Sequence, residues 1–175
     1  MSTQAHQSPL WMPVLITVAI LFSFALACGM PFAGLAAIAA ITLAPRNAFV
    51  LSALGWLANQ IIGFGFLGYP LDAMTFAWGA ALGLSALTAT GAATFILNKT
   101  NNAAKLLQWG SAFMAAWVAQ QATVFAASLV LGGTATAFAP SVVWFIFWTN
   151  ALAFFVLLAA QQLGARAGVA RPLLA

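Results

Sequence analysis

The sequence predicts an all-α integral membrane protein, a single domain covering residues 1–175 with six transmembrane helices. Of the 175 residues, 65% are hydrophobic and only 3% are charged, and the mean hydropathy is +1.05. Soluble domains carry about a quarter charged residues, which excludes that class. The apolar residues form long runs, and a helix needs about 20 such residues to cross a bilayer. Six spans use roughly 120 residues and leave about 55 for loops and tails.

The first three runs end at helix-breaking residues. Trp11 suits an interfacial anchor at the start of the first run, which stops before Gly29 and Pro31. The second run is short, rich in alanine, and ends at Pro45. The third run ends in the turn-forming segment 68–72. We therefore expect spans over residues 9–27, 32–44 and 48–67.

The last three runs are separated by polar or glycine-rich segments. The polar segment 98–102 ends the fourth run, and Gly132 and Gly133 follow the fifth. A tail with Arg166 and Arg171 follows the sixth. We expect these spans over residues 73–97, 106–131 and 142–163.

The few charges predict the orientation. With six spans and a cytoplasmic N-terminus, every basic residue falls on the cytoplasmic side, where Lys and Arg are enriched in membrane proteins. The only acid, Asp72, falls in an outer loop. Both termini are therefore expected in the cytoplasm. The basic residues are Arg46, Lys99, Lys105, Arg166 and Arg171.

Small residues predict where helices approach closely. Gly79 and Gly83 lie four residues apart in the fourth expected span, and alanines crowd the second. Such spacing lets helix backbones pack tightly in lipid. We interpret these residues as ordinary helix packing, with a docking surface for another subunit as the alternative.

Composition excludes most catalytic and nucleic-acid functions. The five basic residues are scattered, so they form no nucleic-acid face. The chain has no phosphate-binding loop of the ATPase type, and one acid cannot support paired-carboxylate catalysis. His6, the only histidine, lies in the polar N-terminal segment, which leaves no partner for a membrane nucleophile.

Cys28, the only cysteine, is the residue with the most distinctive chemistry. A lone cysteine in an apolar chain is commonly a small buried hydrophobic residue. Its expected position at the outer end of the first span gives it a second interpretation. A thiolate is a soft ligand, and one thiolate can supply one axial bond to a metal already held by a macrocycle. The outer loops are expected to converge there on a vestibule.

Two stretches of the sequence carry recognisable motifs. The first is Cys28-Gly29-Met30-Pro31-Phe32, followed by residues 43–49 (Leu-Ala-Pro-Arg-Asn-Ala-Phe). The second is residues 56–60 (Trp-Leu-Ala-Asn-Gln), with Gly63-Phe64 and Tyr69-Pro70. Both stretches resemble the BtuM family of small proteobacterial membrane proteins. These proteins are similar to the substrate-binding S-components of energy-coupling-factor vitamin transporters. The resemblance covers residues 28 to about 72, and the expected size and six-span topology agree with it.

The resemblance implies uptake of vitamin B12 across the bacterial inner membrane, with cobalamin bound at the periplasmic face. It implies that the Cys28 thiolate is the axial ligand of the corrin cobalt. It further implies a substrate without its dimethylbenzimidazole base on cobalt, and removal of cyanide from cyanocobalamin. S-components dock on an energising module through small residues of their first helix. The first span here lacks a clear Ala-x-x-x-Ala pair, and the family is often solitary, so the energising partner stays open.

Polar and aromatic residues near the outer half supply further candidates for corrinoid contact. Amides in lipid need partners, so interhelical hydrogen bonds are the first interpretation, and contact with corrin amide arms is the second. Aromatic side chains suit the apolar ring edge but also serve as core or interfacial anchors. Asp72 is interpreted first as solvated or capping the fourth span. The candidates are Cys28, Phe32, Asn59, Gln60, Tyr69, Asp72, Gln120 and Trp144, with Phe64, Phe66, Gln121, Phe145 and Asn150 in addition.

Three hypotheses of function stay open from the sequence. The first is a cobalamin-binding transport protein. The second is a thiol-dependent membrane enzyme that removes cyanide from a corrinoid, with Cys28 as its catalytic residue. The third is a structural subunit that packs beside other helices.

Overall fold

The computed structural model describes residues 13–18, 21, 30–168 and 173, and every described element is helical. Four long helices dominate the described part: α3 (Pro45–Gly65), α4 (Ala73–Lys99), α5 (Lys105–Leu131) and α7 (Pro140–Arg166). Two short helices accompany them, α2 (Phe32–Thr42) and α6 (Thr134–Ala137). Each long helix is long and apolar enough to cross a membrane. This supports a multi-pass helical membrane protein, and the four helices overlap the segments expected as spans at 48–67, 73–97, 106–131 and 142–163.

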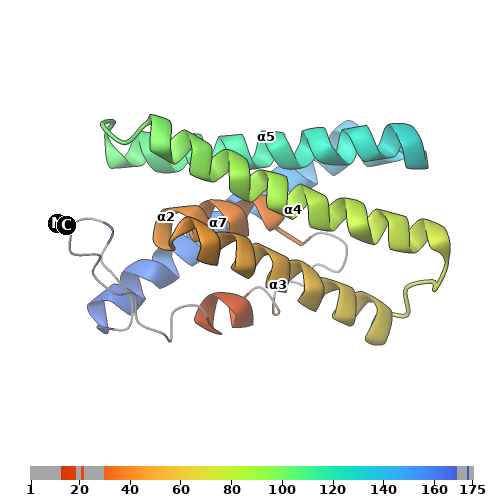
Figure 1. Ribbon diagram of the computed structural model, residues 1–175, viewed down its shortest axis with the longest axis horizontal. Helices are drawn as coiled ribbons and strands as arrows, with labels where there is room; N and C mark the ends of the chain where they lie inside the picture. The colour runs from red at the N-terminus through yellow and green to blue at the C-terminus, as the bar shows by residue number, and fades with distance from the viewer. Residues whose placement is uncertain (1–12, 19–20, 22–29, 169–172, 174–175) are drawn as a thin grey trace.

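Successive long helices run antiparallel, so the basic residues at their ends lie together at one end of the bundle and the acidic residue lies at the other (Figure 1). Arg46 begins α3, Lys105 begins α5, and Lys99 and Arg166 lie in the last turns of α4 and α7. We call this the basic end. Asp72 precedes α4 at the opposite end, which we call the Asp72 end. The separation of charges matches the pattern from which the orientation was predicted; which end faces the cytoplasm stays a prediction.

Helix α2 differs from the span expected at 32–44. Its 11 residues rise only about 16 Å, roughly half of a hydrocarbon core of about 30 Å. It therefore does not cross a membrane by itself, and six complete spans are not confirmed. The backbone turns at Leu43 and Ala44 and enters α3 at Pro45, a residue suited to a first helical turn.

Helix α2 occupies the centre of the bundle, in contact with α3, α4, α5 and α7 (Figure 1). Nine of its 11 residues are buried, so it is a core element rather than a lipid-facing one. The close packing depends on small residues. A Cβ at Gly34 would lie 2.6 Å from the carbonyl oxygen of Asn150 and 3.1 Å from the backbone nitrogen of Phe154. The backbones of α2 and α7 thus meet at Gly34.

Residues 13–18 are helical and fall within the first expected span, residues 9–27. Leu15 is fully buried in the same cluster as Leu35, Leu51 and Leu157, so this turn packs against α2, α3 and α7. Most of the rest of the expected span, including residues 22–27, lies outside the described residues.

Hydrogen bonds between polar side chains join the long helices to one another. The hydroxyls of Ser52 and Thr90 join α3 to α4 at 2.6 Å, and those of Thr88 and Thr123 join α4 to α5 at 2.8 Å. At the basic end, the side-chain amide of Gln108 donates to three backbone carbonyls of the α4–α5 loop, those of Thr100, Asn101 and Ala103. These bonds fix the loop against α5 without any charged group.

Candidate functional site

The site expected from the sequence centres on Cys28, which lies outside the described residues together with Gly29. The described chain resumes at Met30, which is 3% exposed, and at Pro31, which is fully buried. Met30 packs in a core cluster with Phe32 and Leu35. Met30 and Pro31 therefore lie in the interior of the bundle, whereas the sequence predicted that they belong to an outer loop with Cys28 and Gly29.

The first turn of α2 shows how this segment is held. The four N–H groups at a helix start lack intrahelical acceptors, and in a membrane they must be satisfied inside the protein. Phe32 N–H donates to Met30 O at 2.9 Å, and Leu35 N–H donates to Pro31 O at 3.0 Å. Ala33 N–H donates to the side-chain oxygen of Gln120 at 2.9 Å, and Gly34 N–H donates to that of Asn150 at 3.0 Å. The N–H groups of residues 32–34 thus all have acceptors, and the N–H of Leu35 makes the first i→i−4 bond of the helix.

Gln120 and Asn150 act as side-chain caps supplied from two other helices. Both are buried, and they lie near the middles of α5 and α7. Asn150 also donates from its amide nitrogen to Ile146 O at 2.9 Å, which fixes its orientation. For these two residues the structure shows interhelical hydrogen bonding, the first interpretation given to membrane amides. It also places the start of α2 at mid-depth in the bundle.

Asn59 and Gln60 lie on α3, toward the Asp72 end. Asn59 is 4% exposed, and Gln60 is half-buried with its side-chain oxygen against α4, 2.6 Å from where a Gly79 Cβ would stand. One turn earlier, the Trp56 indole lies against Gly83 and donates to Gly79 O at 2.8 Å. The sequence predicted close helix packing at Gly79 and Gly83. In the structure two large α3 side chains, which are also four residues apart, pack against these glycines.

Tyr69 and Asp72 belong to the α3–α4 connection at the Asp72 end. The Tyr69 ring lies over Gly63 and meets Phe64 edge-on, with centroids 6.0 Å apart. Phe64 also stacks on Phe76 at 4.8 Å. The Asp72 carboxylate accepts the backbone N–H of Thr75 at 2.8 Å. Hydrogen bonds from the Thr75 backbone and side chain hold the pKa of Asp72 below its usual value, and the capping role predicted for it is confirmed.

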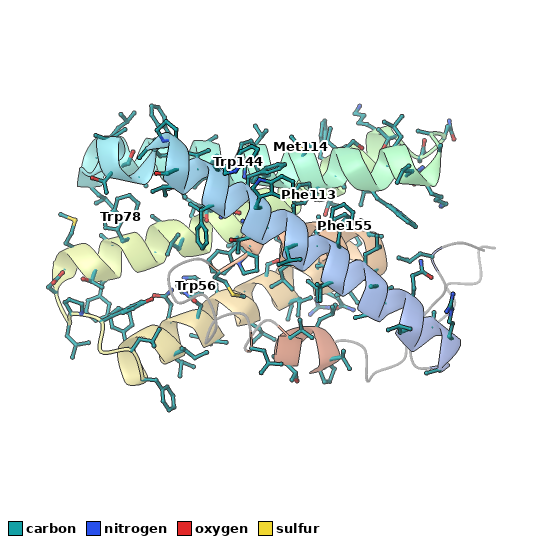
Figure 2. The ribbon with its side chains drawn as sticks, turned by 180° about the vertical axis from the view of Figure 1, so that it is seen from behind. Trp56, Trp78, Phe113, Met114, Trp144 and Phe155 are labelled. Carbon is teal, nitrogen blue, oxygen red and sulfur yellow. The ribbon has the colours of Figure 1, made fainter. Side chains whose placement is uncertain are left out.

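The two other aromatic candidates lie in different environments. Phe32 is 2% exposed in the core cluster at the start of α2. Trp144 is 62% exposed on α7, stacks on Phe147 at 6.3 Å and meets Trp148 edge-on at 5.5 Å. Figure 2 shows Trp144 and Phe155 along α7, and Phe155 is also exposed. The position of Trp144 favours its interpretation as an anchor in lipid over contact with a ligand within the bundle.

The structure therefore brings some candidates together and separates others. Phe32, Gln120 and Asn150 meet at the start of α2, directly after the segment that contains Cys28. Asn59 and Gln60 lie on α3, and Tyr69 lies in the α3–α4 connection on the same half of the bundle. Trp144, Phe66 and Phe145 are mainly exposed instead.

Sequence reasoning assigned no individual role to Trp56 or Gln108. The signal for Trp56 is its spacing: Trp56 and Gln60 are four residues apart, as are Gly79 and Gly83 on the antiparallel partner. When one helix has two large residues four positions apart and an antiparallel neighbour has two glycines at the same spacing, the large side chains are predicted to pack against the glycines. Gln108 carried no comparable signal, since its three acceptors are backbone carbonyls of a loop.

Comparisons of the chain with models of known protein families, with curated proteins and with solved structures found no match. Relationship to any family therefore depends on the residue patterns in the sequence itself.

Proposed function

We propose that this protein binds cobalamin and mediates its uptake across a bacterial inner membrane, with the Cys28 thiolate as an axial ligand of cobalt. The proposal includes six membrane-inserted helices, a substrate entering from the periplasmic Asp72 end, and both termini in the cytoplasm. An energy-coupling-factor module is proposed as the source of energy. The likeness of residues 28 to about 72 to the BtuM family supports this assignment.

The position of Met30 and Pro31 is the observation that carries the proposal. These residues directly follow Cys28-Gly29, and they are buried at mid-depth between helices α3, α4, α5 and α7. The four long helices extend past the start of α2 toward the Asp72 end (Figure 1). A ligand bound at the start of α2 would therefore be surrounded by membrane helices, as a bulky substrate taken out of water requires.

The chemistry of this half of the bundle also suits a corrinoid. The basic residues of the described part lie at the other end, and Asp72 is exposed in the connection before α4. This half instead carries aromatic rings, such as Phe64 and Tyr69, and the amides of Asn59 and Gln60. A broad apolar ring with neutral amide arms suits uncharged side chains of this kind better than a charged nutrient would, because a buried charge needs a partner.

The visible spectrum of purified protein tests the assignment. Protein purified in the presence of cobalamin is expected to retain about one corrinoid per chain with a shifted spectrum, because a thiolate bond changes the electronic state of cobalt. Cys28→Ser should abolish the shift and weaken binding. Cys28 is the only cysteine, so no second thiol can replace it. Binding with an unshifted spectrum in wild type, or an unchanged shift in Cys28→Ser, would contradict the proposed bond.

Uptake itself requires a second measurement. Growth of a cobalamin-requiring bacterium that lacks its own importer should be restored by the wild-type protein and not by Cys28→Ser. Expression with and without an energy-coupling-factor module would show whether that partner is needed. Spectroscopic binding without growth under either condition would contradict the transport function.

A further inference from the structure

A cavity of about 300 Å³ opens at the basic end, on the opposite side of α2 from the proposed cobalamin site. Three helices and the single residue Leu173 form its apolar walls, through the side chains of Ala40, Ile41, Leu97, Trp109 and Leu173. Trp109 is largely buried, and Leu173 packs on the same core cluster as Ala40. The cavity is therefore built from segments far apart in the sequence.

Polar side chains stand around the same cavity. Lys105, Asn101 and Gln108 line it together with the apolar walls. Gln108 is 7% exposed, and its amide nitrogen is engaged with the carbonyls of the α4–α5 loop, which include that of Asn101. This bond fixes the loop that bears Asn101. Lys105 and Asn101 are exposed and have nitrogen donors available for an anionic group.

Among the described residues, no acidic side chain lies near Lys105 at this end. The chain contains a single acid, Asp72, and it lies at the opposite end of the bundle. Arg46, Lys99 and Arg166 add positive charge at the ends of the neighbouring helices. The cavity therefore combines an apolar interior with an uncompensated positive charge at its edge.

The depth of the cavity in a bilayer follows from helix length. Helices α4 and α5 have 27 residues each, about 40 Å, whereas the hydrocarbon core is about 30 Å thick. The last turn of α4 and the first turn of α5, which holds Lys105, therefore extend into the headgroup layer together with the α4–α5 loop. Basic pockets between membrane helices at this depth are typical sites for anionic lipid headgroups.

We propose that this cavity binds an anionic phospholipid, with the phosphate at Lys105 and Asn101 and the adjoining glycerol and acyl carbons against Ile41, Leu97 and Leu173. The charge of Lys105 selects an anionic lipid over a zwitterionic one. The apolar walls select a lipid over free phosphate. The lipid would hold the last turns of α2 and α4 and the first turn of α5 together, independently of any transported substrate.

Native mass spectrometry of protein released from lipid nanodiscs tests this proposal. Wild-type protein from equal mixtures of phosphatidylglycerol and phosphatidylcholine is expected to retain phosphatidylglycerol preferentially. Lys105→Gln should reduce this retention roughly fivefold, the change that corresponds to about 1 kcal/mol for one basic residue near anionic lipid. Lys99→Gln is the matched control: it removes the same charge at the same end, but Lys99 lies over the exposed Phe95 ring at 5.6 Å.

Two further experiments distinguish lipid binding in the cavity from nonspecific electrostatic attraction of the lipid to the basic end. Ala40→Leu fills the apolar part of the cavity with a larger side chain. It should reduce retention of phosphatidylglycerol although Lys105 is intact, and the melting temperature checks that the variant is folded. Glycerol phosphate at millimolar concentration should not displace the lipid. Equal losses in Lys99→Gln and Lys105→Gln, or displacement by glycerol phosphate, would overturn the proposal.

Discussion

Helices α2 and α5 are both strongly apolar, yet they occupy opposite kinds of environment. Nine of the 11 residues of α2 are buried, compared with seven of the 27 in α5. Six residues of α2 are alanine or glycine, whereas α5 exposes large side chains such as Leu106, Val118 and Val130. Both environments are apolar in a membrane, so hydrophobicity does not separate core from lipid-facing surface. Side-chain size does, because close helix packing requires small residues.

Each of these helices contains one glycine, and replacing the two glycines tests the comparison. This prediction has the largest expected effect on stability. Gly34→Ala in α2 should lower stability by about 1–3 kcal/mol, because the new methyl group meets the α7 backbone at 2.6 Å. Gly110→Ala in α5 should be neutral or stabilising by up to about 1 kcal/mol, since nothing lies within 4 Å and alanine favours a helix. Thermal melting in detergent measures both. Equal effects of the two substitutions would contradict the central position of α2.

Replacing the amide side chains that cap α2 should have an intermediate effect on stability. Gln120→Leu or Asn150→Leu leaves one buried N–H of α2 without an acceptor and should cost about 1–2 kcal/mol each. Gln121→Leu is the control, because it makes the same chemical change at the next position, away from the start of α2. We expect it to shift stability by less than about 0.5 kcal/mol. A loss in Gln121→Leu as large as in Gln120→Leu would show that the cap is not the cause.

The cap of α4 is exposed and has the smallest expected effect. Asp72→Asn should lower the melting temperature by a few degrees at most at pH 7, because asparagine remains a good capping residue. The pKa of Asp72 is lowered by Thr75, so its ionised form stabilises the fold above the unfolded value near 3.8. That contribution is lost as pH falls through the lowered pKa. Melting from pH 7 to pH 3 should bring the two proteins together, and a gap that widens on acidification would contradict this.

The long helices could be predicted from sequence because local signals mark both ends of each one. Charged, proline or glycine residues bound α3, α4, α5 and α7, and their interiors are mainly apolar and uncharged. Helix α2 is also bounded by prolines, Pro31 and Pro45, and its start was predicted, but its burial at the centre of the bundle was not. Its run has the composition of a span, and the acceptors of its first N–H groups are Gln120 and Asn150, which are 87 and 116 residues away from the groups they cap. Contacts at that separation leave no periodicity in a single sequence.

The candidate site was predictable to a smaller extent, for the same reason. Asp72 could be assigned as a cap because its acceptor role is local, three residues from Thr75. The membrane amides had two interpretations, and only their partners could distinguish them. Trp144 and Phe32 are both aromatic residues near helix starts, yet one is exposed and the other is buried. Which aromatic residues face inward depends on helix rotation, which the sequence does not determine when both environments are apolar.

The capping of α2 by later parts of the chain has a consequence for biosynthesis. During translation α2 leaves the ribosome well before Gln120, and Asn150 follows later still. Until both residues are inserted, two backbone donors of the central helix must use water or other temporary acceptors. The N-terminal half therefore cannot reach its final arrangement alone, and the last step of assembly is the arrival of α7 against a helix that was synthesised more than 100 residues earlier.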